Sequence, residues 1–501
     1  MTIYDVARGT RDFLPDETVV RDHVDRIIRS TFESYGCQRV QTPIFENFGL
    51  FAARSGEEIR ESMFTFVSDR EEFALRPEMT AAVCRVIASG KLGNAPLPYK
   101  LYYVGECFRY CRPQAGRYRE FTQAGLELMG SSSPLADAEV IAIAVKTLKR
   151  LGIDAFLLKI GNIGIFRGIL QQIYPKEFEQ QSRIINNIDH VMSVREKCNA
   201  INSRQKLDQD DLDYLRVETE SLYRLQEEVE FSGKLEILPE QSVSEQKARE
   251  QLKRLPEVAE ATHRAMWSSK AIVPAETADL LMNISRMRGD VDTVLPQAKH
   301  LLADTPVAGC LDDLALVCEL LKEHGVGGFE VVLGVARGLD FYTGTVFEID
   351  SPLLGAQKQI CGGGRYDRLV EEFGGRSIPA TGFAFGVDRV VEVFQRSARA
   401  KASHSVVDAF VVVVSPDSRA QGVRTAESLR GRGVRVSMDL MGLDMREQLG
   451  YAAKLGSEFA IIIGLAEIDK ASCKLRQMST RTEETVSLSA VADMLLSKKG
   501  R

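Results

Sequence analysis

The chain has 501 residues, of which 44% are hydrophobic and 27% are charged, and its formal net charge is −6. This composition excludes a largely disordered chain, and the length predicts two or three domains rather than one core. The longest apolar runs, at 140–145 and 409–414, are far too short to span a bilayer, so no membrane association is expected. The acidic balance argues against a general polyanion binder and against DNA as a partner, although local basic patches could still meet a specific RNA.

The cysteines predict a reducing compartment. There are nine, an odd number, and they are scattered without any CxxC pair. We therefore expect a cytoplasmic protein. Cys107 and Cys111 are the closest pair, but no second pair completes a tetrahedral site, so no structural metal is expected.

An amphipathic helix is the first predicted element, because apolar residues recur at helical spacing from Val20 to Phe32 before Gly36. Strands are predicted around 39–41, 101–104 and 121–129. From about 170 to 325 the chain is rich in Glu, Gln, Arg and Leu with little strand character, which indicates an inserted helical subdomain.

Strand character returns at 329–334 and 342–349, and a glycine run at 362–364 precedes a helical stretch at 366–372. The glycine run could be a strand bulge or a place where a backbone approaches a ligand closely. Residues 382–394 resemble a strand or turn that enters a helix, and the polar stretch 396–405 is the predicted linker.

Beyond the linker, strand and helix patterns alternate, which predicts a small α/β unit. The segments are 409–414, 418–430, 434–438, 445–455 and 459–463. The first strand runs into Ser415, Pro416 and Asp417 without a GxGxxG pattern, so dinucleotide binding is rejected.

Arginines are the strongest candidates for chemistry, since the chain has no Walker A, HExxH or GxSxG pattern. Guanidinium groups suit bidentate contacts to phosphates and carboxylates, although surface ion pairs are the alternative. One cluster surrounds Gly116, and other arginines lie next to glycines at predicted strand ends: Arg109, Arg112, Arg117, Arg119, Arg337, Arg365 and Arg389.

Six segments, taken together and in order, closely resemble the histidyl-tRNA synthetases, a family of class II aminoacyl-tRNA synthetases. They are 8–15 (RGTRDFLP), 75–80 (LRPEMT), 108–121 (FRYCRPQAGRYREF), 337–343 (RGLDFYT), 362–367 (GGGRYD) and 382–389 (GFAFGVDR). The resemblance covers residues 8 to about 165 and about 330 to the end of the chain.

The resemblance implies an α+β catalytic core at 1–400, built on an antiparallel sheet and interrupted by the helical insertion. It also implies a C-terminal α/β anticodon-binding domain with a mostly parallel sheet at 406–501. The implied activity is histidine-tRNA ligase, with ATP, Mg²⁺, L-histidine and tRNA(His) as substrates and partners. The helix at about 17–35 and the segment ending at Pro43 match the part of the family that forms a homodimer.

The resemblance also implies roles for individual residues. Arg109 would hold the α-phosphate of ATP, Arg389 the γ-phosphate, and Phe121 would stack on adenine, with Arg117 nearby. Arg337 would stabilise charge at the reacting carboxylate and phosphate, so Arg109, Arg337 and Arg389 are the expected catalytic residues.

Glu127 and Tyr342 would face the two imidazole nitrogens of histidine, which selects imidazole over apolar rings. The alternative for Glu78 and Glu127 is a surface carboxylate, although apolar neighbours in the sequence argue against it. The full set expected to bind histidine is Glu78, Met79, Thr80, Gln123, Glu127, Arg337, Phe341, Tyr342 and Tyr366.

Gln114 and Arg119 are candidates for contacts to the tRNA. Two positions depart from the family pattern: Cys111 replaces a glutamate that helps to place ATP, and Phe341 replaces a tyrosine. The departure at Cys111 favours the main rival function, a catalytically silent paralogue such as the regulatory subunit of ATP phosphoribosyltransferase. A second rival, an RNA-binding regulatory module that uses only the tail, would not need the retained arginines.

Overall fold

The protein is described from a computed structural model, which covers residues 4–52, 60, 62–93, 95–110, 118–227, 244–270, 272–335, 341–355, 358–397 and 407–499. Contacts divide the chain into two compact units, Met1–Ala400 and Lys401–Arg501. Each unit has its own sheet and its own hydrophobic core. None of the helices within the described ranges has the length and apolar character needed to cross a membrane.

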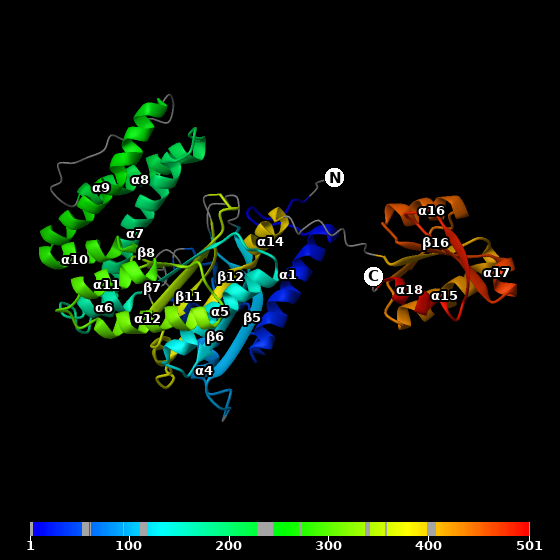
Figure 1. Ribbon diagram of the computed structural model, residues 1–501, viewed down its shortest axis with the longest axis horizontal. Coiled ribbons are helices and arrows are strands. Elements are labelled where there is room, and N and C mark those ends of the chain that lie inside the picture. The colour runs from blue at the N-terminus through cyan, green and yellow to red at the C-terminus, as the bar shows by residue number, and fades with distance from the viewer. Residues whose placement is uncertain are drawn as a thin grey trace. The chain divides into compact units, whose positions relative to one another are not determined.

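A nine-stranded sheet forms the centre of the first unit (Figure 1). Neighbouring strands are antiparallel from β5 to β7, and β8 and β9 are also antiparallel, while β1 pairs with β5 and β7 with β9 in parallel. In sheet order the strands are β1 (Gln38–Arg39), β5 (Tyr99–Phe108), β6 (Glu120–Met129), β12 (Ala380–Gly386), β11 (Gln359–Arg365), β10 (Thr345–Asp350), β7 (Leu157–Asn162), β9 (Glu330–Val332) and β8 (Arg288–Gly289). The predicted antiparallel core is confirmed.

Helices cover this sheet because each buries an apolar face against it. Helix α1 (Pro15–Ser34) buries Val24, Ile28 and Phe32, as the spacing of the apolar residues predicts. Burying a side chain of this size stabilises the fold by about 1.5–3 kcal/mol relative to leaving it exposed. Helix α5 (Pro134–Arg150) carries the apolar run 140–145, which is fully buried between the sheet and its helical neighbours.

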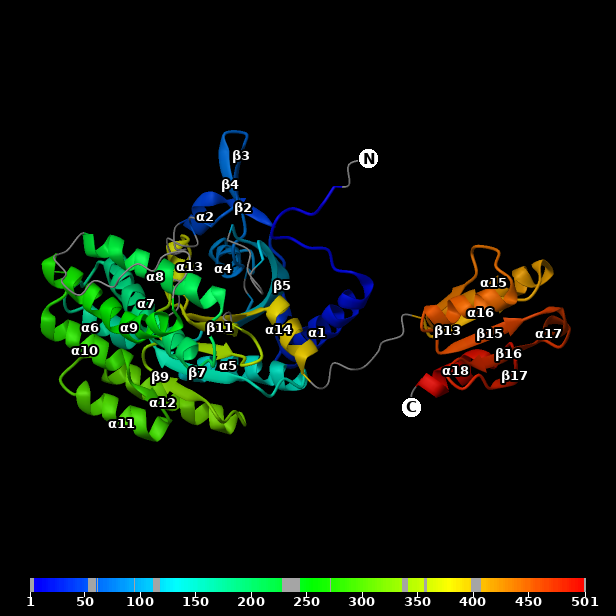
Figure 2. The ribbon, with the colours of Figure 1, turned by 90° about the horizontal axis from the view of Figure 1, so that it is seen from above.

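Two shorter helices begin next to residues of the predicted site. Helix α4 (Thr80–Ala88) follows the LRPEMT segment, and α14 (Val387–Arg396) follows directly from strand β12. A three-stranded antiparallel sheet, β2 (Phe45–Asn47), β4 (Glu71–Leu75) and β3 (Thr65–Ser68), packs with α2 (Phe48–Ala52) and projects from the unit (Figure 2).

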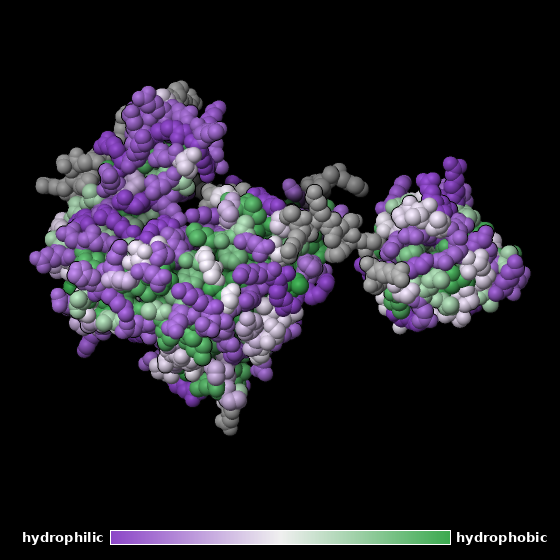
Figure 3. All heavy atoms as spheres, viewed as in Figure 1, coloured by the Kyte–Doolittle hydropathy of each residue, from purple (hydrophilic) through white to green (hydrophobic). Residues whose placement is uncertain are grey.

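The helical insertion lies between β7 and β9, which pair in parallel although most of the insertion separates them in sequence. Figures 1 and 2 show it at the opposite end of the sheet from α1. Its helices are α6 (Gly164–Leu170), α7 (Phe178–Asn202), α8 (Gln209–Glu227), α9 (Glu245–Ser269), α10 (Ala275–Ser285), α11 (Val291–Leu301) and α12 (Ala308–Glu323). Hydrophilic residues cover the visible face of α8 and α9 (Figure 3), while Leu215, Leu252 and Trp267 are buried.

The second unit is an α/β domain around a five-stranded sheet of order β14-β13-β15-β16-β17. Strands β14 (Val436–Met438), β13 (Ala409–Val413) and β15 (Phe459–Ile463) are parallel, as predicted. An antiparallel hairpin, β16 (Ser472–Gln477) and β17 (Glu483–Ser487), extends the edge, so the sheet is mixed. The helices are α15 (Arg419–Gly431), α16 (Met445–Lys454), α17 (Leu465–Asp469) and α18 (Val491–Lys499).

Candidate active site

One cavity of about 740 Å³ in the first unit brings together most of the residues that the sequence marked for function. Its walls come from the sheet, from the start of α4 and α14, and from helix α7 of the insertion. The predicted site residues that line it are Glu78, Thr80, Arg109, Phe121, Gln123, Glu127, Phe341, Tyr342, Tyr366 and Arg389.

Strand β6 explains why three of these residues share one wall. Phe121, Gln123 and Glu127 are separated by even numbers of residues, so their side chains project from the same face of the strand. On the neighbouring strand β12, glycines stand opposite two of them, Gly386 opposite Gln123 and Gly382 opposite Glu127. The polar side chains of Gln123 and Glu127 therefore face glycines on β12, which leave room for them.

Glu127 is buried, with 1% of its surface exposed, and three hydroxyl groups surround its carboxylate. Thr80 Oγ1 donates to Oε1 over 2.8 Å, Tyr103 Oη donates to Oε1 over 3.0 Å, and Tyr366 Oη donates to Oε2. Burial raises the pKa of Glu127 to about 8, although these hydrogen bonds oppose the shift. Glu127 thus forms a polar centre in an apolar part of the sheet.

Glu78 is the second buried carboxylate, and it caps the start of helix α4. Its Oε1 accepts from the Ala81 N–H over 2.9 Å, and its Oε2 accepts from the Thr80 N–H over 2.5 Å. Burial raises the pKa of Glu78, while these two backbone hydrogen bonds and the nearby positive charge of Arg109 act in the opposite direction. Since 5% of Glu78 is exposed, neither Glu78 nor Glu127 is a surface carboxylate.

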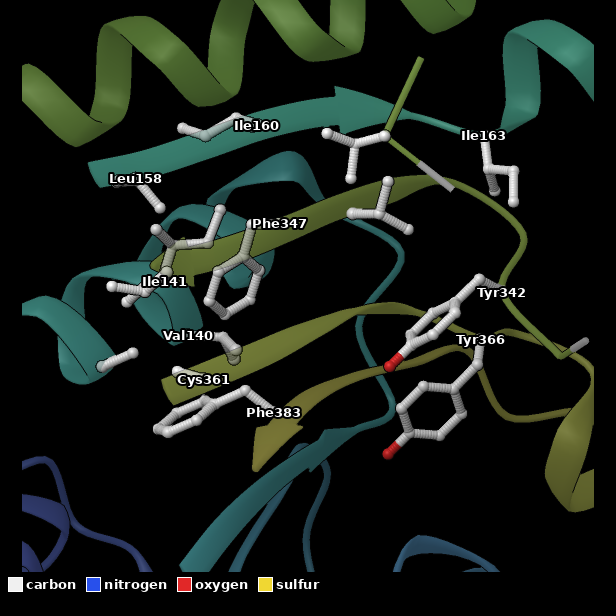
Figure 4. Packing of buried hydrophobic residues seen from close by; sticks show 14 of the residues in the cluster. Val140, Ile141, Leu158, Ile160, Ile163, Tyr342, Phe347, Cys361, Tyr366 and Phe383 are labelled. Atoms are coloured by element: carbon white, nitrogen blue, oxygen red, sulfur yellow. The ribbon is translucent and has the colours of Figure 1, made fainter. Parts of the chain in front are cut away.

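Three aromatic rings close the cavity around this centre. Phe341 lies between Tyr342 and Tyr366, with centroid distances of 4.8 Å and 5.5 Å. Figure 4 shows the rings of Tyr342 and Tyr366 next to each other, with both hydroxyls pointing in the same direction. The main-chain carbonyl of Tyr342 accepts from Arg167 Nε over 2.7 Å, which fixes this turn to helix α6.

The arginines predicted to bind ATP lie on two different elements. Arg109 follows strand β5, donates from Nε to the Pro77 carbonyl over 2.9 Å, and places its guanidinium carbon 5.4 Å from the centre of the Phe121 ring. Arg389 lies in the first turn of α14 and donates to the Gln359 carbonyl over 2.7 Å. Both side chains line the cavity, so cationic groups and an aromatic ring share its wall with Glu127.

Several predicted residues lie elsewhere. Met79 is buried in the core and lines a separate, smaller cavity of about 380 Å³ rather than the large one. The guanidinium of Arg119 stacks on the Tyr110 ring at 4.1 Å, outside the lining of the large cavity. Arg337, Arg117, Gln114 and Cys111 lie outside the described residues.

Sequence reasoning did not find Tyr103, Glu348 or Gln359. Tyr103 binds Glu127 directly, but a tyrosine in an apolar strand reads as a core residue. Gln359 and Glu348 line the cavity, where Gln359 Nε2 donates to Glu348 Oε1 over 2.7 Å. The alternation of side chains along their strands does not show which face of the sheet borders a cavity. Arg365, by contrast, is a buried structural arginine, since Asp137 binds its Nε over 3.0 Å.

Within the described part of the chain, no three His, Cys, Asp or Glu side chains converge as possible metal ligands. The donor set of the cavity instead suits organic and anionic groups. Buried carboxylates with hydroxyl donors suit a substrate with N–H groups, and the arginines suit phosphates.

Comparison with known proteins agrees with this geometry. A family model described as histidyl-tRNA synthetase matches residues 9–266 and 208–390, and one described as an anticodon binding domain matches 408–498. The histidine–tRNA ligase of Archaeoglobus fulgidus is 36% identical over 480 residues, which cover 96% of each chain. That of Methanocaldococcus jannaschii is 33% identical, over 97% of this chain and 98% of the relative.

Solved structures show the same fold. A histidyl-tRNA synthetase from a Nostoc species superposes with a TM-score of 0.69 at 22% identity, covering 99% of this chain and 100% of that one. The apo enzyme of Staphylococcus aureus gives a TM-score of 0.60 at 23% identity. Because the family model and the archaeal relatives both cover most of the sequence, this chain belongs to the histidyl-tRNA synthetase family.

Proposed function

We propose that this chain is a histidine–tRNA ligase, which activates L-histidine with ATP and transfers it to the 3′ end of tRNA(His). The observation that carries the proposal is the joint lining of one cavity by the hydroxyl-bound Glu127 and by the arginines Arg109 and Arg389. An amino acid with two ring nitrogens and a triphosphate could therefore lie next to each other. Archaeal proteins named histidine–tRNA ligase match almost the whole chain.

In the first step, the histidine carboxylate attacks the α-phosphorus of ATP, and pyrophosphate leaves as histidyl-adenylate forms. Arg109 would hold the α-phosphate and Arg389 the γ-phosphate, while Phe121, beside Arg109, would carry the adenine ring. Arg337 would stabilise the charge at the reacting atoms, a role that rests on the family resemblance. Magnesium arrives with ATP as part of the substrate and neutralises phosphate charge.

Specificity for histidine would come from Glu127 and Tyr342 at the imidazole nitrogens. Glu78, Thr80, Gln123 and Tyr366 complete the polar part of the pocket. A buried site that hydrogen-bonds its substrate rejects an analogue lacking those groups by roughly 10⁴ to 10⁵-fold. Such a site needs no separate editing domain.

In the second step, a hydroxyl of the 3′-terminal ribose attacks the adenylate, which gives histidyl-tRNA and AMP. We propose that the second unit binds the anticodon, in agreement with the family model that matches 408–498. Arg119 and Gln114 would contact the tRNA, as the family resemblance implies. A homodimer through the region of α1, in the cytoplasm, completes the proposal.

The silent regulatory paralogue is the second candidate, because one similar fold is described as an ATP phosphoribosyltransferase regulatory subunit/histidyl-tRNA synthetase from Bacillus halodurans. At 21% identity and a TM-score of 0.64, that likeness concerns the fold alone. Two features favour the ligase: the second unit is present, and Arg109 and Arg389 line the cavity.

Charging of tRNA tests the ligase proposal against the paralogue. Purified protein, ATP, magnesium and histidine are incubated with a tRNA(His) transcript, and aminoacylated tRNA is separated from free tRNA on an acidic gel. A ligase charges this transcript and leaves a tRNA of different anticodon and acceptor end uncharged. A silent paralogue binds histidine but charges neither.

A further inference from the structure

Asp388, the residue before Arg389, binds groups from three separate parts of the chain. Its Oδ1 accepts from Arg21 of helix α1 over 2.7 Å and from Arg11 over 3.2 Å, and its Oδ2 accepts from the Thr122 N–H over 2.8 Å. Arg21 also donates to Thr122 Oγ1 over 2.9 Å. Asp388 is buried, while Arg11 and Arg21 are partly exposed, and Asp388 lines the same cavity as Arg389.

Aromatic rings hold the two arginines in place. Phe13 lies between them, with the Arg11 guanidinium carbon 4.4 Å and that of Arg21 3.9 Å from the ring centre. Arg11 also lies 4.3 Å from the centre of the Tyr118 ring. Cation–π contacts of this kind are attractive, and they reduce the freedom of both guanidinium groups.

The same N-terminal segment reaches the other side of the predicted ATP site through the backbone. The Gly9 carbonyl accepts from the Arg119 N–H over 2.8 Å, and the Arg119 carbonyl accepts from the Arg109 N–H over 2.9 Å. Gly9 has φ +89°, and a Cβ atom there would lie 2.7 Å from Arg119 Cγ, so only glycine permits this approach. Residues 8–13 therefore connect Arg109 on one wall with Asp388 on the other.

The geometry points to Asp388, held by Arg11 and Arg21, as a positioning residue that fixes α14 and Arg389 against strand β6 and Phe121. The guanidinium groups of Arg11 and Arg21 both bind the Asp388 carboxylate. Asp388 precedes Arg389 on α14, and Arg21 also binds Thr122, the neighbour of Phe121. If Asp388 loses its charge, two buried or half-buried arginines lose their common partner, and the start of α14 loses its tie to Thr122. The distance between Arg109 and Arg389, which are proposed to bind the α- and γ-phosphates, would then no longer be fixed.

This inference rests on the proposed function, because it assumes that Arg109, Phe121 and Arg389 bind ATP. The full chain is tested as wild type, Asp388→Asn, Arg21→Gln, the double variant, and Asp408→Asn as a matched control. Asp408 is a buried aspartate paired with Arg435 over 2.6 Å in the second unit. KM for ATP and KM for histidine are measured by pyrophosphate exchange, and binding of magnesium-ATP is measured by calorimetry.

The expected result is a rise of about 10- to 100-fold in KM and Kd for ATP in Asp388→Asn, with KM for histidine changed less than twofold. The double variant should fall short of the sum of the single effects, because both substitutions break the same pair. Asp408→Asn should leave both KM values unchanged. A substitution that only unfolds part of the protein would lower kcat without raising KM for ATP.

Equal KM values for ATP in wild type and Asp388→Asn would overturn the inference while histidine-dependent exchange continues. Strictly additive effects of Arg21→Gln and Asp388→Asn would overturn the pairing. If the wild type shows no exchange at all, the ligase proposal fails instead, and the calorimetric Kd for ATP still decides whether Asp388 positions the nucleotide site.

Discussion

Gly382 lies directly opposite Glu127 where β12 pairs with β6, and a Cβ atom at position 382 would lie 1.8 Å from Glu127 Oε2. The missing side chain leaves the space that the carboxylate occupies. Gly363, opposite Phe383 on the pairing of β11 with β12, also leaves no room for a side chain, since its Cβ would lie 2.2 Å from the Gly382 carbonyl oxygen. The glycines thus permit close packing behind the site, and the register of β11 continues through 362–364 without a bulge.

Gly382→Ala should therefore disrupt the histidine site, and it should also strain the β6–β12 pairing, because the same Cβ would lie 2.6 Å from the Leu126 carbonyl oxygen. The added methyl group displaces the Glu127 carboxylate, so we expect KM for histidine in pyrophosphate exchange to rise at least tenfold, while KM for ATP changes little. Gly309→Ala is the control, because a Cβ atom there meets nothing within 4 Å. An unchanged KM for histidine in Gly382→Ala would contradict the assignment of this space to Glu127.

Glu127→Gln tests the proposed contact with imidazole. The substitution keeps the size of the side chain but replaces one acceptor oxygen with an amide group, so at least one of the three hydroxyl donors loses its acceptor. A buried hydrogen-bonding group left without a partner costs about 1–3 kcal/mol, which corresponds to about 5- to 150-fold in affinity. Calorimetric titration with histidine should show this loss, and an affinity equal to wild type would exclude Glu127 from the imidazole contact.

The raised pKa of Glu127 predicts a pH dependence of stability. A carboxyl group whose pKa is about 8 in the folded state and near 4.3 when unfolded binds its proton more tightly in the folded protein. The stabilisation is complete below the unfolded pKa and is lost as the pH rises through about 8. The melting temperature of wild type should fall more steeply between about pH 5.5 and 8.5 than that of Glu127→Gln; parallel curves would argue against a protonated Glu127.

Arg109→Ala tests the phosphate contact. Removal of a fixed cation that stabilises charge in the transition state lowers kcat by about 10² to 10³-fold. We expect this loss in pyrophosphate exchange, together with a higher KM for ATP. Arg432→Ala serves as the control, since Arg432 pairs with Asp493 on the surface of the second unit. Equal rates for the two variants would remove Arg109 from the catalytic residues.

The fold could be predicted where apolar residues that become buried recur in the sequence at the spacing of a helix or a strand. Helix α1 has that spacing and lies at the expected place, and strands β5 and β6 include the predicted strand residues 101–104 and 121–129. The hairpin β16–β17 was missed, because Val486 is the single buried residue of β17 and the polar residues around it resemble a loop. The helix predicted at 366–372 is shorter, Leu369–Glu372, since residues 359–365 form a strand and Tyr366 follows it directly.

The site was predictable only as a set of residue types in motif order. The family resemblance named Phe121, Gln123 and Glu127 as binding residues, and the structure has all three in the lining of one cavity. Residues whose role depends on a distant partner gave no signal of their own: Tyr103 resembles a core residue, and Asp388 resembles a surface carboxylate until Arg11 and Arg21 are seen beside it. Such contacts depend on tertiary packing, which a local pattern does not encode.

The most direct test of the account is amino acid-dependent exchange of pyrophosphate into ATP by the purified chain, run with each amino acid in turn. The account predicts exchange with histidine alone, and its loss in Arg389→Ala, whose side chain lines the cavity beside Glu127. Exchange with another amino acid, or no exchange in a protein that binds histidine, would contradict the claim that this cavity activates histidine.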